Sequence, residues 1–253
     1  MLRTTALFAL LLLLTAASCR KDKAEYGTLE LQFKAYYDDQ PLIMLQPYVY
    51  NDTLDVMFQR FNFYISNVEI NSGQSVDPRQ LIDIDFVDFD GVDNVAAADA
   101  GDLIQVEKVP TGAYDQLSIG LGVPADLNAT QESDYPDSHP LGKESHYWTA
   151  WQSYIFTMIA GKVDTDKDGV FDDSSIGYHL GSDPTYRTVN LAHSFEIQKG
   201  QTTRITLAVD LHQIFKEGDG YMDIIAIPAT HTIANLDQAI KAMDNFQQAL
   251  HIE

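Results

Sequence analysis

The stretch Gln59 to Ile70, QRFNFYISNVEI, is dense in aromatic and β-branched residues, as a central strand of a sheet should be. Its alternation of apolar and polar residues slips near Ser66 and Asn67, which indicates either a β-bulge or a strand that ends and restarts there. Upstream, Gly27 to Tyr36 alternates with a period of two, the pattern of a half-buried strand. These two segments place the fold in a β-rich class.

Similar patterns continue along the rest of the chain. Strand-like segments follow at residues 42–50, 81–89, 104–109, 114–123, 154–162, 188–191, 194–197, 203–211 and 223–227. Residues 93–102 form a predicted small-residue loop, and residues 126–142 a long surface loop rich in Asp, Ser and Pro. No internal repeat and no linker divides these segments, so we expect one domain.

The last segment changes its period from that of a strand to that of a helix. Apolar side chains at helical spacing form a single stripe: Leu236, Ile240, Met243, Phe246 and Leu250. We predict a helix over residues 235–250 that packs against the strands. The predicted fold class is all-β: an antiparallel β-sandwich with long loops and a C-terminal helix, spanning residues 27–253 as a single domain.

The N-terminus has the pattern of an export signal. Arg3 supplies a positive charge, residues 6–14 an apolar segment too short for a membrane anchor, and small residues precede Cys19, the only cysteine. The pattern resembles a bacterial lipobox, although Ala16 stands where leucine is usual. We expect residues 1–18 to be a signal peptide and residues 19–26 a linker. Cys19 would carry the lipid of an outer-membrane lipoprotein, and the pattern does not assign the protein to the periplasmic or the outer face of that membrane. The alternative is a secretory signal cut before Cys19.

The charge balance limits the partners. Lys and Arg total 16 against 37 Asp and Glu, and the net charge of −21 argues against a nucleic acid or an anionic membrane surface as partner. Cations and neutral ligands remain. The sequence contains no nucleophile elbow, no HExxH motif and no pair of carboxylates that stands out from the acidic background. We therefore expect a non-enzymatic protein.

An acidic loop at residues 164–173 has the spacing of a calcium site, D-x-D-x-D-G-x-x-D-D. A glycine at the sixth position permits the sharp turn by which alternate carboxylates converge on a hard cation. Ser175 occupies the twelfth position, where an EF-hand has Glu, so the loop is more similar to those of extracellular repeat modules such as thrombospondin type 3. The alternative is a solvated hairpin tip whose like charges repel each other. The candidate calcium ligands are Asp164, Asp166, Asp168, Asp172, Asp173 and the carbonyl of Val170.

Four segments in a fixed order carry a resemblance to a known family. They are RFNFYISNVEI at 60–70, GLGVPADLN at 120–128, YWTAWQSYIF at 147–156 and YHLGSDPTYRTVNL at 178–191. Together they resemble the MbnP-like family of extracytoplasmic copper-associated proteins, and in order and spacing its lipoprotein branch in Bacteroidota. The resemblance implies a β-sandwich and a copper site built from histidines with an oxidised tryptophan, a kynurenine made by a partner dihaem peroxidase.

Within this resemblance, His179 matches the histidine of an H-L-G motif, and Trp148 and Trp151 match a tryptophan-rich strand. The cysteine that some members carry after the H-L-G motif is absent. The seven histidines form no HxH or HExxH motif, so His146 and His231 are candidates only because they lie beside these segments. Imidazole is a good copper ligand, and two or three converging histidines would suffice.

Two functions remain open. The first is a lipid-anchored, non-enzymatic envelope protein that binds copper near His179, beside a calcium-stabilised loop. The second is a calcium-stabilised surface module that binds a glycan or a protein, with Trp148 and Trp151 as stacking platforms. Clustered histidines beside buried tryptophans would favour the first. Exposed, coplanar tryptophans with scattered histidines would favour the second.

Overall fold

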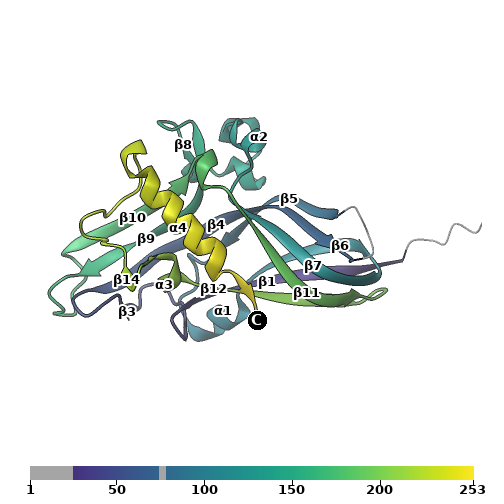
Figure 1. Ribbon diagram of the computed structural model, residues 1–253, viewed down its shortest axis with the longest axis horizontal. Coiled ribbons are helices and arrows are strands. Elements are labelled where there is room, and N and C mark those ends of the chain that lie inside the picture. The colour runs from purple at the N-terminus through teal and green to yellow at the C-terminus, as the bar shows by residue number, and fades with distance from the viewer. Residues whose placement is uncertain (1–24, 74–77) are drawn as a thin grey trace, which may run out of the picture.

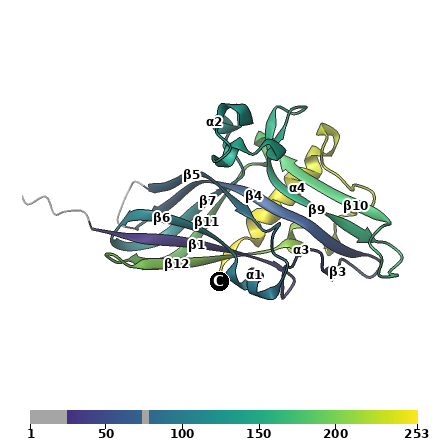
Figure 2. The ribbon, with the colours of Figure 1, turned by 180° about the vertical axis from the view of Figure 1, so that it is seen from behind.

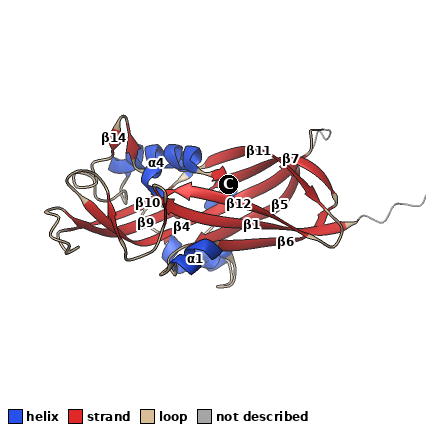
Figure 3. Ribbon diagram, turned by 90° about the horizontal axis from the view of Figure 1, so that it is seen from below, coloured by secondary structure: helices blue, strands red, loops and turns tan. Residues whose placement is uncertain are grey.

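A computed structural model describes residues 25–73 and 78–253. Two sheets lie face to face, which confirms the predicted β-sandwich (Figures 1 and 3). The smaller sheet has the order β15-β12-β1-β2, and β6 also pairs with β1. Its strands are β1 (Tyr26–Tyr37), β2 (Gln40–Pro41), β6 (Asp102–Pro110), β12 (Thr202–Asp210) and β15 (His251–Ile252).

The pairing of β1 with β12 is parallel, with Leu31 opposite Ile205. The other strand pairs of the described residues are antiparallel, as predicted. The alternation in β1 reports which face is buried and carries no information about the direction of the neighbouring strand. The parallel pair is therefore a feature that the pattern does not predict.

The long strand β4 (Asp55–Asn71) is the central strand of the larger sheet. β9 and then β7 pair along one edge of β4, and β3 and then β5 along the other. β8 and β10 pair with β9, and β11 pairs with β7. The bounds are β3 (Pro47–Val49), β5 (Arg79–Asp88), β7 (Gly112–Leu121), β8 (Tyr147–Trp148), β9 (Ser153–Asp164), β10 (Ser174–Gly181) and β11 (Arg187–Ile197).

The predicted irregularity in β4 is a β-bulge. The register of β4 against β7 shifts between Ser66 and Glu69, and Asn67 has a φ of 43°. Asparagine tolerates this left-handed backbone better than most residues because its short polar side chain bonds locally. The strand therefore continues through the slip and does not end there.

The main core lies between the sheets, and the predicted C-terminal helix α4 (Leu236–Ala249) completes it. Phe63 of β4 meets the ring of Phe246 edge-on at 4.9 Å. The hydroxyl of Thr157 on β9 lies 3.5 Å from the sulfur of Met243. Figure 1 shows α4 lying across β4, β9 and β10. The remaining short elements are α1 (Val95–Ala100), α3 (Leu211–Ile214), β13 (Lys216–Glu217), β14 (Gly220–Tyr221), η4 (Asp183–Thr185) and η5 (Ile233–Asn235).

A second, smaller core lies on the other face of the larger sheet. There Tyr64, Tyr154 and Phe156 are buried together with Leu141. Leu141 belongs to the predicted surface loop 126–142, so this loop is in part a cover over the sheet. Figures 1 and 2 show α2 and β8 side by side at this margin of the molecule. The cover contains α2 (Ala125–Asn128), η1 (Glu132–Asp134), η2 (Pro140–Gly142) and η3 (Glu144–His146).

Three segments differ from the sequence expectations. Residues 42–50 form only β3, because three N–H groups in the part of this segment before β3 bond to carbonyls in three separate places, on Ala35, Val92 and Phe58. Residues 93–102 contain the helix α1, which begins where the side chain of Asn94 accepts the N–H of Ala97. Residues 223–227, predicted as a strand, form a turn held by the carboxylate of Asp223.

The predicted signal peptide and Cys19 lie outside the described residues, as does most of the linker. Within residues 25–73 and 78–253, no helix has the length and apolar character needed to cross a bilayer.

Candidate metal centre

Two of the three candidate copper ligands lie side by side. The Nδ1 atoms of His179 and His231 are 3.1 Å apart, and the ring planes meet at 78°. Both side chains are half-buried. At this distance one Nδ1–H donates to the lone pair of the other Nδ1, so the two rings are in different tautomers.

The edge of β10 explains why His231 reaches His179. The Gly177 N–H donates to the Pro228 carbonyl at 2.8 Å, and the Gly177 carbonyl accepts the Thr230 N–H at 3.3 Å. The Thr230 hydroxyl also donates to the carbonyl of His179 at 3.1 Å. The chain before His231 therefore runs along β10 as a short added strand, and this pairing places His231 next to His179.

Gly177 leaves room for the ring of His231. A Cβ atom added at this position would lie 3.2 Å from Cε1 and 3.4 Å from Nε2 of His231. The first distance is shorter than an ordinary van der Waals contact between carbon atoms. A larger residue would press on the imidazole, so the missing side chain is part of the geometry of the pair.

A tight hairpin brings Trp148 to the histidines. β8 turns back onto β9, with Trp148 opposite Ser153, and Gln152 in the turn has a φ of 52°. The Trp148 ring stacks on His231 at 5.5 Å, with 16° between the planes. It also meets His179 edge-on at 5.6 Å. Trp148 is thus in contact with both imidazoles.

The two tryptophans do not form an exposed, coplanar platform. Trp148 and Trp151 are half-buried, their ring centroids are 6.0 Å apart, and the planes are tilted by 46°. Beside them lies an open cavity of about 500 Å³, which His231 helps to line and from which solvent reaches this ring. The lining residues are Ala150, Trp151, Ser182, His231, Thr232 and Leu236.

Both imidazoles of the pair are neutral at pH 7. Burial, followed by the nearby His231 and Arg60, lowers the pKa of His179 to about 4. Burial also lowers the pKa of His231. Neutral imidazole is the form that binds a metal ion, so the pair does not have to release a proton from an imidazolium first.

His146, the third candidate, has a separate role in the structure. Its Nε2 lies 2.8 Å from Oδ1 of Asn62, and its Nδ1 lies 2.9 Å from Oγ of Ser145, so both ring nitrogens are engaged. The amide of Asn62 donates to Asp90 at 3.1 Å, which turns the Asn62 carbonyl oxygen toward His146. The ring is 5% exposed and packs against Tyr64 and the second core.

The strand register adds a methionine that the sequence does not single out. Met158 on β9 is directly opposite His179 on β10 and Asn62 on β4, so the three side chains project from one face of the sheet. Its Sδ accepts a hydrogen bond from Nη1 of Arg60 at 3.7 Å. Met158 is 5% exposed, yet it belongs to neither hydrophobic core.

The donors of the pair fit a copper ion better than a hard cation. Neutral imidazole nitrogens suit copper and zinc, whereas calcium and magnesium take oxygen ligands. The separation of 3.1 Å between the nitrogens is also that of two ligands of one ion. Metal–nitrogen bonds of about 2.0–2.1 Å in a tetrahedral arrangement place neighbouring nitrogens roughly 3.3 Å apart.

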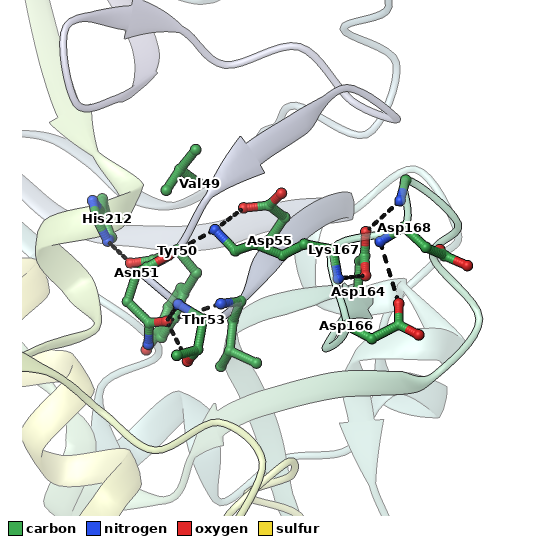
Figure 4. A network of polar contacts seen from close by, with 12 residues as sticks. Val49, Tyr50, Asn51, Thr53, Asp55, Asp164, Asp166, Lys167, Asp168 and His212 are labelled. Atoms are coloured by element: carbon green, nitrogen blue, oxygen red, sulfur yellow. Dashed lines mark hydrogen bonds and ion pairs between the residues drawn. The ribbon is translucent and has the colours of Figure 1, made fainter.

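The acidic loop is the tip of the β9–β10 hairpin (Figure 4). The carboxylate of Asp164 is fully buried and accepts the N–H of Lys167 at 2.6 Å and that of Gly169 at 2.8 Å. The Lys167 ammonium points away from this carboxylate, to Asp55 and to the carbonyl of Asn51, each at 3.1 Å. The loop is thereby tied to β4 and to the turn before it.

Three of the predicted calcium ligands converge in the loop. Asp164, Asp166 and Asp173 each offer a carboxylate oxygen within 4.8 Å of the others. Asp168 instead accepts the N–H of Val170 at 2.8 Å. Asp168 and Asp172 are outside this group of converging carboxylates. The carbonyl of Val170 as a ligand stays a prediction.

Hydrogen bonds and repulsion act in opposite directions on the pKa values of these carboxylates. A hydrogen bond from the Asp168 N–H favours the ionised form of Asp166, but the negative charges of Asp168, Asp173 and Asp164 raise its pKa above the ordinary value. Hydrogen bonds from the N–H and hydroxyl of Thr165 lower the pKa of Asp173. Of these two carboxylates, Asp173 is stabilised in its ionised form by the loop, and Asp166 is the one whose ionised form the neighbouring charges disfavour.

Comparison with known proteins identifies the family. A model of the MbnP family matches residues 26–233. The chain belongs to the MbnP family. Among solved structures, MbnP from Methylosinus trichosporium is similar, with a TM-score of 0.52 and 14% identity over 77% of this chain and 79% of that chain. At this identity the likeness shows the fold alone, and no curated protein matches the chain.

The resemblance to the MbnP family in the sequence pointed to His179 and Trp148, and these residues are in contact. His231 had no motif, and its only signal was its place after the family segments. Met158 and Gly177 had no signal, because a methionine or a glycine inside an apolar strand is usually a matter of packing. Their relation to the pair depends on strand register, which the sequence does not give.

Proposed function

We propose that this protein is an extracytoplasmic, non-enzymatic member of the MbnP family that binds copper through His179 and His231. The observation that carries the proposal is the 3.1 Å distance between their Nδ1 atoms. The lowered pKa values of both rings support it, because they leave the rings in the form that binds a metal. His146 is left out of the ligand set because both of its nitrogens are already hydrogen-bonded.

In this function the chain's own residues hold and orient the ion's ligands. The carbonyl of His179 and the hydroxyl of Thr230 join the two ligand-bearing segments, and Gly177 leaves space for His231. A bound copper ion would be able to accept a further ligand or to change its oxidation state. The partly open cavity beside Trp151 and His231 gives small ligands a way to this position.

Copper competition titration of single variants tests the proposal. His179→Ala should weaken copper binding about tenfold or more, because one remaining imidazole cannot complete the coordination shell. His251→Ala is the matched control and should leave affinity unchanged, because His251 is exposed in β15 and its ring bonds to the nearby Ala249 carbonyl. Equal affinity in wild type and His179→Ala would refute the site.

The resemblance also supports a modified tryptophan and a partner. Of the two tryptophans, Trp148 contacts both imidazoles. We propose Trp148 as the residue that a dihaem peroxidase partner converts to kynurenine. Intact mass and peptide mapping of protein from cells with and without the peroxidase would test this, and an unmodified Trp148 in both samples would contradict it.

A structural calcium ion in the β9–β10 loop is a second proposal. It is supported by the three converging carboxylates Asp164, Asp166 and Asp173, and by the raised pKa of Asp166. An ion there would neutralise the repulsion between the carboxylates and hold the hairpin tip in place. This role does not require contact between the ion and the histidines. A melting temperature that differs between calcium and chelator would support it.

We also propose that the protein is held in the outer membrane by a lipid on Cys19. This rests on the N-terminal sequence pattern alone, since Cys19 lies outside the described residues. The alternative function, a glycan- or protein-binding module that uses Trp148 and Trp151, has less support. The two rings are half-buried and tilted by 46°, and the neighbouring histidines are clustered.

A further inference from the structure

Three of the four family segments meet at the side chain of Asn128, the last residue of α2. This side chain is 6% exposed. Its Nδ2 donates to Oδ1 of Asp183 at 2.7 Å, and its Oδ1 accepts the Ser153 hydroxyl at 3.0 Å and the Tyr154 N–H at 2.9 Å. A carboxylate only accepts and a backbone N–H only donates, so these partners fix the orientation of the amide. None of the functions proposed above uses it.

The bonds of Asn128 lie next to Trp148. The β8–β9 hairpin has two residue pairs, Tyr147 with Tyr154 and Trp148 with Ser153. A hairpin of two strands is marginally stable in water without further contacts. Asn128 bonds to the β9 member of both pairs, through the Ser153 hydroxyl and the Tyr154 N–H. The side chain therefore joins this short hairpin to the cover of the larger sheet.

The same group of bonds reaches the end of β10. The Ser182 N–H donates to Oγ of Ser153 at 2.9 Å, and the next residue, Asp183, accepts the amide of Asn128. Ser182 has a φ of 71°, which residues other than glycine rarely adopt, so its surroundings hold it there. It follows Gly181, where β10 ends, two residues after His179. The hairpin that carries Trp148 and the strand that carries His179 are thus tied together through Asn128.

We infer that Asn128 is a positioning residue of the candidate metal centre, which holds Trp148 against His179 and His231. The inference rests on the proposed function, because it takes these three side chains as the centre. Trp148 contacts both imidazoles, whereas the hydrogen bonds of Asn128 go to other residues. A supporting side chain of this kind fixes the orientation of groups that it does not touch.

The substitution Asn128→Asp tests the role with little change of shape. The carboxylate keeps an oxygen for Ser153 and Tyr154, but it replaces the amide donor with a second acceptor that faces the carboxylate of Asp183. Adding Asp183→Asn returns a donor to this contact, because the new amide can donate to the carboxylate at position 128. The double variant exchanges the two side chains and should restore the bonds.

Gln32→Ala is the matched control for a loss of stability alone. Gln32 is also a buried amide, 7% exposed, and it bonds to the carbonyl of Ala100 at 2.8 Å and to the hydroxyl of Thr206 at 2.9 Å. These partners belong to the smaller sheet and to α1, away from the β8–β9 hairpin. All proteins carry Trp151→Phe, so that Trp148 is the only tryptophan.

The first measurement uses the metal-free full chain, well below the lowest melting temperature of the set. In Asn128→Asp the fluorescence of Trp148 should move to longer wavelength and acrylamide should quench it more, because the indole leaves its half-buried place on His231. The double variant with Asp183→Asn should return both signals to the reference. Gln32→Ala should lower the melting temperature and leave both signals unchanged.

The second measurement is a copper competition titration of the same proteins. Asn128→Asp should weaken copper binding about tenfold, the lower end of the range for residues that support ligands from outside the coordination shell. The double variant should regain most of this affinity. Gln32→Ala should bind copper as the reference protein does.

The outcomes separate the inference from the proposed function. Unchanged Trp148 fluorescence in Asn128→Asp, an equal change in Gln32→Ala, or a folded double variant without recovery would each overturn the inference. If the reference protein binds no copper, or His179→Ala binds it equally, the proposed function is wrong, and the metal-free fluorescence still decides whether Asn128 holds Trp148. Loss and recovery of both the fluorescence and the copper affinity would support both.

Discussion

The ring of His146 is held neutral by its surroundings. Burial, followed by the positive charges of Lys143 and Arg60, lowers its pKa from 6.5 to about 4. Between these values the unfolded chain binds a proton at this histidine and the folded chain does not. The free energy of unfolding therefore falls as the pH falls through this window, and it is not affected by His146 above it.

The variant His146→Gln should remove this pH dependence. The difference between the two pKa values corresponds to about 3 kcal/mol in total, or up to about 1.4 kcal/mol per pH unit. In urea unfolding at pH 7, 6 and 5, the stability of wild type should fall more steeply than that of His146→Gln. Above pH 7 the two curves should run parallel. Identical slopes from pH 7 to pH 5 would mean that folding does not lower the pKa of His146.

Single residues of the site differ in how far the sequence predicts them. His179 stands in a family segment, and its neighbour Trp148 in another, so resemblance finds both. His231 follows a chain segment that pairs with β10 mainly through backbone groups, and backbone pairing leaves no mark in side-chain identity. Met158 is found only after β9 has been aligned with β10, because a shift of one residue would turn it to the opposite face.

At the scale of the element, the β9–β10 hairpin is the part of the centre that the sequence describes best. The D-x-D-x-D-G spacing predicts a tight turn, and Gly169 takes a φ of 86° within it. Asp164, at the end of β9, accepts two N–H groups of the turn and is fixed by them. Its neighbours Asp166 and Asp173 are exposed, so they are free to respond to a cation.

Asp166→Ala should abolish the effect of calcium on this hairpin. With a dissociation constant of about 1 mM, 10 mM calcium adds about 1.4 kcal/mol of stability, which raises the melting temperature by roughly 3–5 °C. Asp172→Ala removes one equal charge outside the converging group and should keep this shift. Thermal unfolding in calcium and in chelator measures it. A wild-type protein that melts at one temperature in both would contradict the calcium site.

Elsewhere in the chain, the sequence predicts an element correctly where a single local pattern of residues dominates the segment. Residues 27–36 and 59–70 alternate or are densely apolar, and they form β1 and β4. Residues 42–50 are equally apolar, but their N–H groups bond to carbonyls in three different places, so no ladder forms. In α1 a single cap at Asn94 starts a helix among small residues that read as a loop.

At the scale of the whole molecule, the periodicity of apolar residues predicts the fold class. It does not predict how the strands are arranged. A period of two shows that one face of each strand is buried, and a sandwich is the simplest way to bury many such faces. It does not show that β1 and β12 are parallel, nor that residues 125–152 cover the outer face of the larger sheet. Both depend on long-range contacts, and the candidate metal centre lies where such contacts meet.

The charge and the direction of the chain bear on how the molecule meets a membrane. The net charge of −21 opposes binding to an anionic surface. The described chain starts with β1 at one end of the sandwich, and the β9–β10 loop lies at the other end (Figure 1). An anchor before residue 25 would therefore leave the acidic loop and the hairpin on the side away from the bilayer.

The variant Cys19→Ala should move the protein from the membrane fraction to the soluble fraction. Acyl chains on Cys19 would be its attachment, since no helix of the described residues can span a bilayer and the surface charge is unfavourable. Its melting temperature should equal that of wild type, because Cys19 precedes the described fold. Lys23→Ala, four residues further on, should stay with the membrane. A Cys19→Ala protein that still pellets with membranes after a high-salt wash would contradict the lipid anchor. It would also leave the alternative, a secretory signal cut before Cys19, without support.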